Sequence, residues 1–369
     1  MFRAFAACRT VVLCVLARNS AITVALDATP LTLSSGGLLR YTAEFSRALA
    51  LNFPEDRFLL VSDRPFRMPE HAPPNLTRGR PPRNLLERRW WLWGLSRQPA
   101  DVFHGTDFAV PYLPVRPSVL SLHDLSPWLE PGWHHAAGRV RLRTPFLIGL
   151  GLATIILTDS EAVRRQAIER FRIHPQRIVA VPLAAPARFQ PVRTPPARPY
   201  FLFVGTLEPR KNLPMLLAAW REVRKQHAVD LALAGRRRAD FPALPPEPGL
   251  ELLGEVPDED LPALYSGALA SVYPSLYEGF ALPVLEAMQC GAAVIASRDP
   301  AITEVAAGAA LQLEARDSRA WFEALTAAAT RPAWLDAWRE KALARAREFS
   351  WARTARLTRE VYEQARRQW

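Results

Sequence analysis

The stretch SVYPSLYEGFALPVLEAMQCGAAVIAS, residues 271–297, decides the fold. It begins with an aliphatic run that predicts a strand ending at Pro274, continues through a loop, and becomes helical near Pro283. Proline is tolerated in the first turn of a helix, because the amide hydrogen that it lacks would have no partner there. The apolar run at residues 292–297 predicts a further strand. This order of strand, loop, helix and strand indicates a parallel α/β sheet.

The same alternation extends over the chain from about residue 21 and indicates two doubly wound parallel sheets. In the first half, strands are predicted at residues 22–27, 57–62, 101–105, 118–124, 154–159 and 177–182, and helices at 38–51, 85–95, 137–149 and 160–171. In the second half, strands are predicted at residues 200–205, 229–235, 250–254, 268–274, 292–297 and 309–314, ahead of a helical tail. The predicted helix-capping residues are Ser160, Asn212 and Ser350.

A proline-rich stretch without periodicity, residues 182–199, predicts a linker between two domains. A chain of 369 residues is long enough for two, at about 100 to 200 residues per domain. The predicted parts are an extension (1–20), a first Rossmann-like domain (21–190), a second (191–349) and a final helix packing back on the first domain (350–369). Such sheets bind ligands at the carboxyl ends of their strands, so the chemistry is expected between the domains.

Composition and charge narrow the class of protein. With 49% hydrophobic and 22% charged residues, the chain is predicted to be globular. Three widely spaced cysteines do not make a disulfide framework, so a reducing, cytoplasmic setting is expected. The net charge of +11 suits a polyanionic partner or reflects an arginine-rich composition, because the arginines are scattered. A non-enzymatic polyanion-binding protein is the remote alternative, although no nucleic-acid-binding signature is found.

No apolar run of about 18 residues occurs, so a membrane-spanning helix is not expected. Residues 1–20 are interpreted as an extension in preference to a weak signal-like segment. Two segments predict peripheral contact with the inner face of an anionic membrane. They are residues 84–97, where Arg88 and Arg89 adjoin Trp90, Trp91 and Trp93, and the stripe of Arg139, Arg141 and Arg143. An amphipathic helix packed on the sheet is the alternative for the first segment.

Two glutamates bracket a loop that is suited to phosphate binding. The loop comprises Gly279, Phe280, Ala281 and Leu282. It precedes a helix amino terminus, where unpaired backbone amides and the helix dipole favour an anion. Glu278 and Glu286 lie on its two sides, and carboxylates are good acceptors for vicinal hydroxyls. The arrangement predicts a ligand with sugar rings on both sides of its phosphates, which describes a nucleotide sugar.

A second loop, GTLEPRKN at residues 205–212, follows the first predicted strand of the second half. It begins at Gly205 and carries Arg210 and Lys211, which could neutralise a diphosphate. Only three lysines occur in the chain, so Lys211 is less readily explained as composition. A solvated basic loop is the alternative.

These stretches resemble the retaining glycosyltransferases of family 4, which have the GT-B fold of two Rossmann-like, doubly wound domains facing across a cleft. The resemblance rests on GTLEPRKN (205–212), LLGEVPDEDLPALYSGA (252–268) and EGFALPVLEAMQCG (278–291). It extends to LSSGGLLRYTAEFSRALA (33–50), DVFHGTDFAVP (101–111), SLHDLS (121–126) and TDSEAVRRQ (158–166). Nearly the whole chain from residue 21 is covered.

The resemblance implies roles for the matching residues of the second domain. Arg210 and Lys211 would bind the donor diphosphate, with Gly205 beside them. Glu278 would contact hydroxyls of the transferred sugar, and Glu286 would contact the ribose of the nucleotide.

It implies further roles on the first-domain side of the cleft. Gly36 and Gly37 would approach the donor phosphates or the acceptor, since a side chain there would block the backbone. His123 would contact the donor sugar, although a histidine beside an aspartate is more often structural. His104 is the weaker candidate and would pack beneath the cleft. Ala281 stands where relatives often have glycine, and it resists a positive φ, so the phosphate loop could be shifted.

The predicted function is that of a retaining hexosyltransferase, of mannosyl or glucosyl type, acting from a nucleotide diphosphate sugar on a glycan or lipid-linked acceptor. The triplet Asp258, Glu259 and Asp260 is interpreted as a capped helix start and not as a metal site. No metal or other cofactor is expected, because Arg210, Lys211 and the helix terminus can offset the charge of the leaving diphosphate. A nucleotide-sugar epimerase or a phosphorylase of related fold is the alternative.

Overall fold

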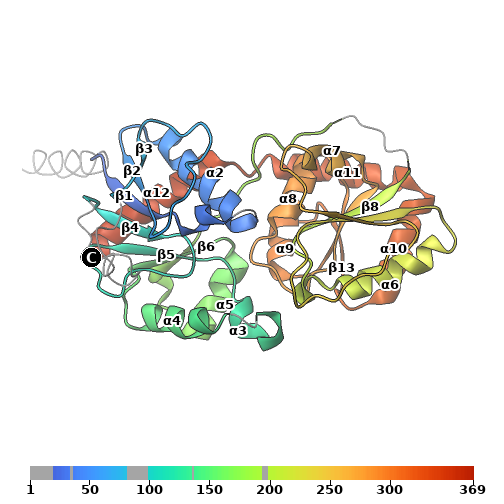
Figure 1. Ribbon diagram of the computed structural model, residues 1–369, viewed down its shortest axis with the longest axis horizontal. Helices are drawn as coiled ribbons and strands as arrows, with labels where there is room; N and C mark the ends of the chain where they lie inside the picture. Colours follow the sequence, from blue (N-terminus) through green and yellow to red (C-terminus); the bar gives the residue numbers. More distant parts are fainter. Residues whose placement is uncertain (1–19, 34–35, 81–98, 135–136, 193–197) are drawn as a thin grey trace, which may run out of the picture.

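The computed structural model describes residues 20–33, 36–80, 99–134, 137–192 and 198–369. They form two α/β lobes that lie side by side along the long axis of the molecule (Figure 1). The predicted extension, apart from Ser20, and the tryptophan-rich segment at residues 84–97 lie outside the described residues.

The first lobe is built on a seven-stranded parallel sheet in the order β3-β2-β1-β4-β5-β6-β7. Its strands are β1 (Thr23–Asp27), β2 (Arg57–Val61), β3 (Leu76–Arg78), β4 (Val102–Gly105), β5 (Ser118–Leu122), β6 (Ile155–Thr158) and β7 (Ile178–Ala180). The central strands are buried aliphatic runs, as expected where helices cover both faces of a sheet. Strand β3 was not predicted, because three residues of which only Leu76 is buried make neither an apolar run nor an alternation.

The second lobe is built on a six-stranded parallel sheet in the order β10-β9-β8-β11-β12-β13. Its strands are β8 (Tyr200–Val204), β9 (Asp230–Ala234), β10 (Leu250–Gly254), β11 (Ala270–Tyr273), β12 (Val294–Ser297) and β13 (Leu311–Leu313). All six were predicted from their aliphatic runs, to within one or two residues at most ends.

Helices cover the faces of both sheets. They are α2 (Gly37–Asn52), α3 (Ser126–Leu129), α4 (Gly138–Gly149), α5 (Glu161–Phe171), α6 (Leu213–Arg224), α7 (Leu261–Gly267), α8 (Leu282–Gln289), α9 (Pro300–Ala306), α10 (Ser318–Thr330), α11 (Asp336–Ala346) and α12 (Trp351–Gln368). Short 3-10 helices are η2 (Thr29–Thr32), η4 (Pro131–Trp133), η5 (Pro175–Arg177), η6 (Pro209–Lys211) and η7 (Pro332–Leu335). In the first lobe, α2 and α12 lie on one face of the sheet, and α4 and α5 lie on the other (Figure 1).

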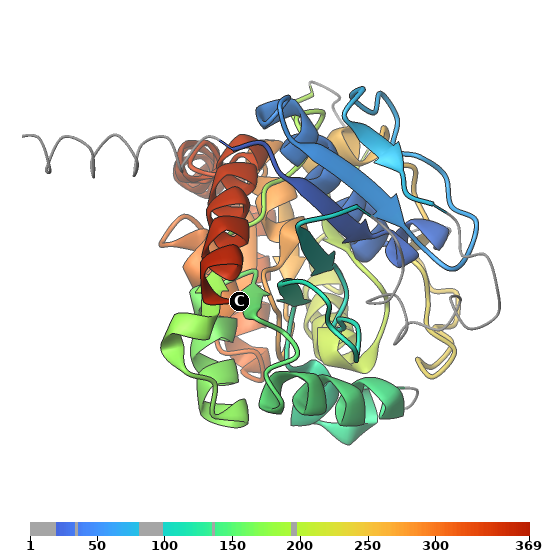
Figure 2. The same ribbon diagram turned by 90° about the vertical axis from the view of Figure 1, so that its left-hand side faces the viewer.

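The last helix, α12, returns from the second lobe and packs along α2 of the first (Figure 2). Buried polar contacts hold it there. Arg359 donates from Nε to Asp56 at 2.5 Å, and the Tyr362 hydroxyl lies 2.8 Å from Nδ1 of His104. At its start, the Thr354 hydroxyl donates to the carbonyl of Pro182 at 2.7 Å. The two points at which the chain passes between the lobes therefore lie next to each other.

Two of the three predicted helix caps are confirmed. Ser160 accepts from the Val163 amide at the start of α5, and Ser350 accepts from the Arg353 amide at the start of α12. Asn212 occupies the N-cap position of α6 as predicted, but its side chain makes no capping bond to that helix. Its amide instead donates to the carbonyls of Pro274 and Ala315, and thereby ties together the loops that follow β11 and β13.

Candidate functional site

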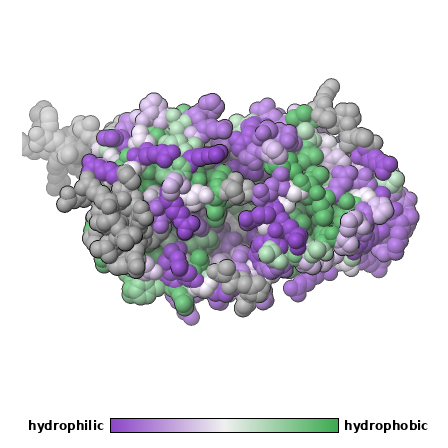
Figure 3. All heavy atoms as spheres, viewed as in Figure 1, coloured by the Kyte–Doolittle hydropathy of each residue, from purple (hydrophilic) through white to green (hydrophobic). Residues whose placement is uncertain are grey.

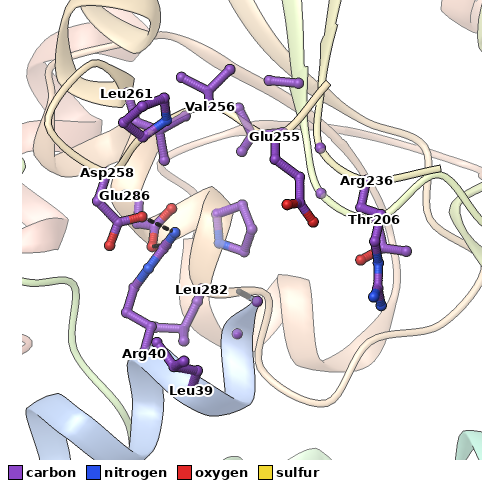
Figure 4. Close-up of a pocket in the computed structure, with 18 residues that line it drawn as sticks. Leu39, Arg40, Thr206, Arg236, Glu255, Val256, Asp258, Leu261, Leu282 and Glu286 are labelled. Atoms are coloured by element: carbon purple, nitrogen blue, oxygen red, sulfur yellow. Dashed lines mark hydrogen bonds and ion pairs between the residues drawn. The ribbon is translucent and has the colours of Figure 1, made fainter. Parts of the chain in front are cut away.

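A cavity of about 430 Å³ lies between the lobes, at the carboxyl ends of the second-lobe strands. The second lobe contributes the loops after β8, β9 and β10 and the first turns of α8, while the first lobe contributes the first turn of α2 (Figure 4). Five of the predicted site residues line it, namely Gly36, Gly37, Gly205, Leu282 and Glu286. This is the position at which open α/β sheets bind ligands.

The other predicted site residues do not line this cavity. They are His123, Arg210, Lys211, Glu278, Gly279, Phe280 and Ala281. Except for His123, they belong to the two loops that follow β8 and β11, which are joined by a bond from the Leu276 amide to the Arg210 carbonyl. The phosphate loop thus has Glu278 at one end and, at its other end, the start of α8 that carries Glu286.

Glu286 is fully buried on α8, whose first turn contains Pro283 as predicted. Its two carboxylate oxygens have different partners. One accepts from the hydroxyl of Tyr265 at 3.0 Å, and the other forms an ion pair with the guanidinium of Arg40, which comes from α2 of the first lobe. A carboxylate of the second lobe is therefore neutralised by a cation of the first.

Arg40 also reaches Asp258, at 2.5 Å from its second terminal nitrogen. The other oxygen of Asp258 lies 2.8 Å from Arg188 in the linker. The prediction of a side-chain cap at residues 258–260 is wrong: Asp260 precedes α7 without capping it, and Asp258 is held by the two arginines. Arg40 and Asp258 were missed as site residues, although they lie in two of the stretches that carry the resemblance, residues 33–50 and 252–268.

A second group of buried charges lies at the loops after β8 and β11. Glu278 accepts from Lys211 Nζ at 2.6 Å and from Arg210 at 3.0 Å. Burial alone would raise the pKa of Glu278, but the two cations outweigh it and lower this pKa to about 2. Arg210 also pairs with Glu208 at 2.8 Å, and Glu208 in turn pairs with Arg238 at 2.7 Å. Glu208 lies in the quoted stretch at residues 205–212 but was assigned no role, and Arg238 lies in none of the quoted stretches.

Ala281 takes the left-handed conformation, with φ 66° and ψ 56°, immediately before α8. The side chain was expected to resist a positive φ and to shift the loop. Ala281 instead adopts the conformation that glycine favours, at a cost of about 1 to 2 kcal/mol, and its carbonyl accepts from the Val284 amide in the first turn of α8.

The lobes touch directly at Gly279. A methyl group at this residue would lie 2.1 Å from the backbone carbonyl oxygen of His123, so only glycine fits without moving one lobe. Around this contact, Ser160 donates to the Gly279 carbonyl at 2.7 Å, and the Leu125 amide donates to the hydroxyl of Tyr277 at 3.0 Å. These bonds fix the phosphate loop against the carboxyl ends of first-lobe strands.

His123 is engaged on both ring nitrogens. Nδ1 lies 2.8 Å from a carboxylate oxygen of Asp159, and Nε2 lies 2.7 Å from the carbonyl of Thr106. A carbonyl can only accept, so Nε2 carries a proton. Burial alone would lower the pKa of His123, but the Asp159 carboxylate outweighs it and raises this pKa to about 9. The predicted contact with a donor sugar stays a prediction, since it would require one of these bonds to break.

Comparisons with known proteins agree with this architecture. Residues 198–331 match the family model described as glycosyl transferases group 1. The chain is 34% identical to the O-antigen chain mannosyltransferase B of Escherichia coli over 306 residues, which cover 76% of this chain and 78% of that protein. The GT-B fold expected from the sequence is confirmed by two similar solved structures.

The first of these is HepE of Anabaena in complex with UDP-glucose, with a TM-score of 0.72 and 15% identity over 93% of this chain and 99% of that one. The second is WaaG, a glycosyltransferase involved in lipopolysaccharide biosynthesis, with a TM-score of 0.67 and 15% identity over 92% of this chain and 99% of that one.

We predict that Gly279→Ala separates the lobes without unfolding either of them. The added methyl group collides with a backbone atom of the opposite lobe, which cannot rotate away. A displacement of about 1 Å at a reaction site costs on the order of 100-fold in rate, so glycosyl transfer should fall by about that factor. Small-angle scattering should show a larger radius of gyration. Gly149→Ala is the control, because a methyl group there meets nothing within 4 Å; equal loss in both variants would contradict the prediction.

We predict a pH-dependent contribution of His123 to stability. The folded pKa of about 9 exceeds the ordinary value of about 6.5, so the stabilisation is fully present below pH 6.5 and is lost as the pH rises through 9. The difference in the free energy of unfolding between the wild type and His123→Gln should therefore shrink between pH 7 and 9, by up to about 1.4 kcal/mol per pH unit. Urea unfolding at four pH values measures it, and a constant difference would exclude the buried imidazolium.

Proposed function

This chain belongs to the group 1 glycosyltransferases, and we propose that it transfers a hexosyl group, with retention, from a nucleoside diphosphate sugar to a hydroxyl of a growing polysaccharide. The name of the E. coli relative supports a mannosyl group and an O-antigen-like acceptor. The observation that carries the proposal is the phosphate loop, with the Arg210 and Lys211 cations at one end and the buried Glu286 at the other.

The cation pair supports binding of the donor diphosphate. Lys211 has three N–H donors, of which Glu278 takes one, so two remain for phosphate oxygens. Arg210 has five, of which Glu208 takes two and Glu278 and the Tyr277 carbonyl take one each, so one remains beside the same carboxylate. In the proposed reaction, negative charge develops on the leaving β-phosphate as the glycosidic bond breaks. Fixed cations and the amides at the start of α8 stabilise this charge without reorganising, which is where most of the rate enhancement should arise.

The cavity supports binding of the nucleoside. Its volume of about 430 Å³ lies in the range of small-molecule sites. Gly205 and Gly235 line it, and Gly235 lets the loops after β8 and β9 pack closely, because a methyl group there would lie 2.0 Å from the Gly205 carbonyl oxygen. Glu286 faces this cavity and can accept from ribose hydroxyls (Figure 4). Glu278, on the far side of the phosphate loop, would then contact the transferred sugar.

Helix α4 supports contact with an anionic membrane, although of the three arginines in the predicted stripe only Arg139 is exposed. Arg141 is turned inward, where it donates to the carbonyls of Pro127 at 2.6 Å and His134 at 2.9 Å. The exposed face of α4 is apolar instead.

Three large apolar side chains follow that face at four-residue intervals. They are Leu142, Phe146 and Leu150, with exposed fractions of 80%, 50% and 61%. Apolar atoms gather over α4 at the lower edge of the first lobe (Figure 3). Arg139 is exposed one turn earlier, so an apolar strip adjoins a positive charge, which suits an anionic lipid surface and a lipid-linked acceptor. Among the described helices, none is both long and apolar enough to cross a bilayer.

We predict that the double variant Arg210→Gln/Lys211→Gln loses at least 1,000-fold in turnover, because each fixed donor to a developing charge is worth about 100- to 1,000-fold. Release of nucleoside diphosphate is followed with GDP-mannose and with UDP-glucose as donors. The charge-matched control is Arg221→Gln/Lys225→Gln, whose side chains pair with Glu247 and Glu222 on the surface. Turnover retained in the first variant would contradict the assignment.

We predict that Leu142→Ser/Phe146→Ser weakens flotation with vesicles containing phosphatidylglycerol by at least tenfold at low salt. Burying one large apolar side chain contributes about 1.5 to 3 kcal/mol, so losing two partly inserted ones removes at least one order of magnitude. Leu51→Ser is the control, since Leu51 is 53% exposed on α2 of the same lobe. Unchanged flotation of the double variant would remove α4 from the contact surface, and a wild type that does not float would end the membrane proposal.

A further inference from the structure

We propose that Arg40 is a positioning residue for the donor ribose, which it serves by holding the Glu286 carboxylate from the opposite lobe. The inference rests on the function proposed above and adds a residue to its nucleoside site. The first observation is the set of bonds at Glu286. A carboxylate offers about four lone-pair positions, and Arg40 and Tyr265 take one on each oxygen. Two positions remain on a carboxylate that lines the cavity. None of its side-chain surface is exposed, so two vicinal hydroxyls reach these positions only when the groups that cover the carboxylate shift.

Holding the carboxylate in one orientation matters because Glu286 is fully buried. A buried carboxylate without a cation would turn toward any donor or take up a proton, and its free oxygens would no longer face the ribose in a fixed direction. Tyr265 restrains one oxygen from within the second lobe. Arg40 restrains the other and supplies the balancing charge.

Arg40 is itself restrained by three groups. Its second terminal nitrogen binds Asp258 at 2.5 Å, and its guanidinium lies over the ring of Phe189, 5.7 Å from the centroid. Only 19% of its side chain is exposed. A planar fork bridging two carboxylates is a geometry that lysine cannot reproduce, because an ammonium acts as a single point of charge. Since Arg40 belongs to α2 of the first lobe, the ribose site is complete only when the lobes are in contact.

Comparison with Arg188 distinguishes the positioning of Glu286 from a role that only joins the two lobes. It also binds Asp258, at 2.8 Å, and lies over the same Phe189 ring, 5.9 Å from its centroid. It joins α2 through Glu44 at 2.9 Å. It differs from Arg40 in making no bond to Glu286 and in not lining the cavity. Loss of Arg188 therefore removes contacts between the lobes that are comparable to those of Arg40, while Arg40 still holds the Glu286 carboxylate.

The experiment measures discrimination between ribose and 2′-deoxyribose. Isothermal titration calorimetry gives dissociation constants of the full chain for GDP, 2′-deoxy-GDP, UDP and 2′-deoxy-UDP, in the wild type, Arg40→Gln, Arg40→Lys and Arg188→Gln. Hydrogen bonds to a charged acceptor lead us to expect a wild-type preference for the ribonucleotide of about tenfold or more. In Arg40→Gln the preference should fall to about threefold or less, in Arg40→Lys it should be intermediate, and in Arg188→Gln it should be unchanged.

If Arg40 had only a structural role, its replacement would weaken binding of a ribonucleotide and of its 2′-deoxy form by the same factor. An unchanged preference in Arg40→Gln would therefore overturn the proposal, whatever the loss of affinity. If Arg40→Gln does not fold, the preference for ribose over 2′-deoxyribose is measured instead in Arg40→Lys and Tyr265→Phe, because each of these variants weakens or removes one of the two bonds that hold Glu286. A wild type that binds nucleoside diphosphates without preferring ribose would overturn this inference and leave the proposed function standing. A wild type that binds none of the four would count against the proposed function itself.

Discussion

The backbone contact between Gly279 and His123 sets how closely the two lobes approach each other. At most points between lobes, side chains can adjust to small shifts, but here a loop of the second lobe lies directly against a carbonyl of the first. The bonds from Ser160 and Leu125 surround this contact and are satisfied only at the same separation. The loop at residues 279–282, which begins at Gly279, thus takes its position from both lobes.

The two buried glutamates of the site are neutralised in different ways. Glu278 obtains both of its cations, Arg210 and Lys211, from its own lobe, so its charge balance does not depend on how the lobes are arranged. Glu286 obtains its cation, Arg40, from the other lobe. Because a buried unpaired charge is costly, the Glu286 ion pair favours contact between the lobes, whereas the ion pairs of Glu278 do not require it. With the function proposed above, the donor diphosphate would meet cations of one lobe, and the ribose would meet a carboxylate that both lobes hold.

Much of the fold could be predicted from the sequence, because buried parallel strands are continuous aliphatic runs and each lies between recognisable helices. The edge strand β3 could not, since most of it is exposed. The cap at Asn212 failed for a related reason: capping is a local rule, but the Asn212 amide bonds to Pro274 and Ala315, which only the tertiary fold brings near.

The site could be predicted as far as its motifs extended. The two glutamates, the cation pair and the glycines lie in loops that can be recognised in the sequence, and these loops follow one another in the expected order. Arg40 and Asp258 could not be found in this way, because they are 218 residues apart and no local pattern links them. A motif search can find residues of the opposite lobe, as it found Gly36 and Gly37, but it does not show which side chains pair across the two lobes.

The arginine surplus has an internal explanation that weakens its use as evidence for a polyanionic partner. Two arginines show this by donating to backbone carbonyls: Arg177 binds the Ala153 carbonyl in the loop before β6 at 2.6 Å, and Arg345 binds those of Val305 and Glu304 in the last turn of α9 at 2.9 Å. A guanidinium has five donors in a rigid fork, so it can satisfy more than one buried acceptor while remaining charged. These positive charges lie where the fold needs hydrogen-bond donors. A net charge of +11 therefore describes how this chain satisfies its carbonyls more than what it binds.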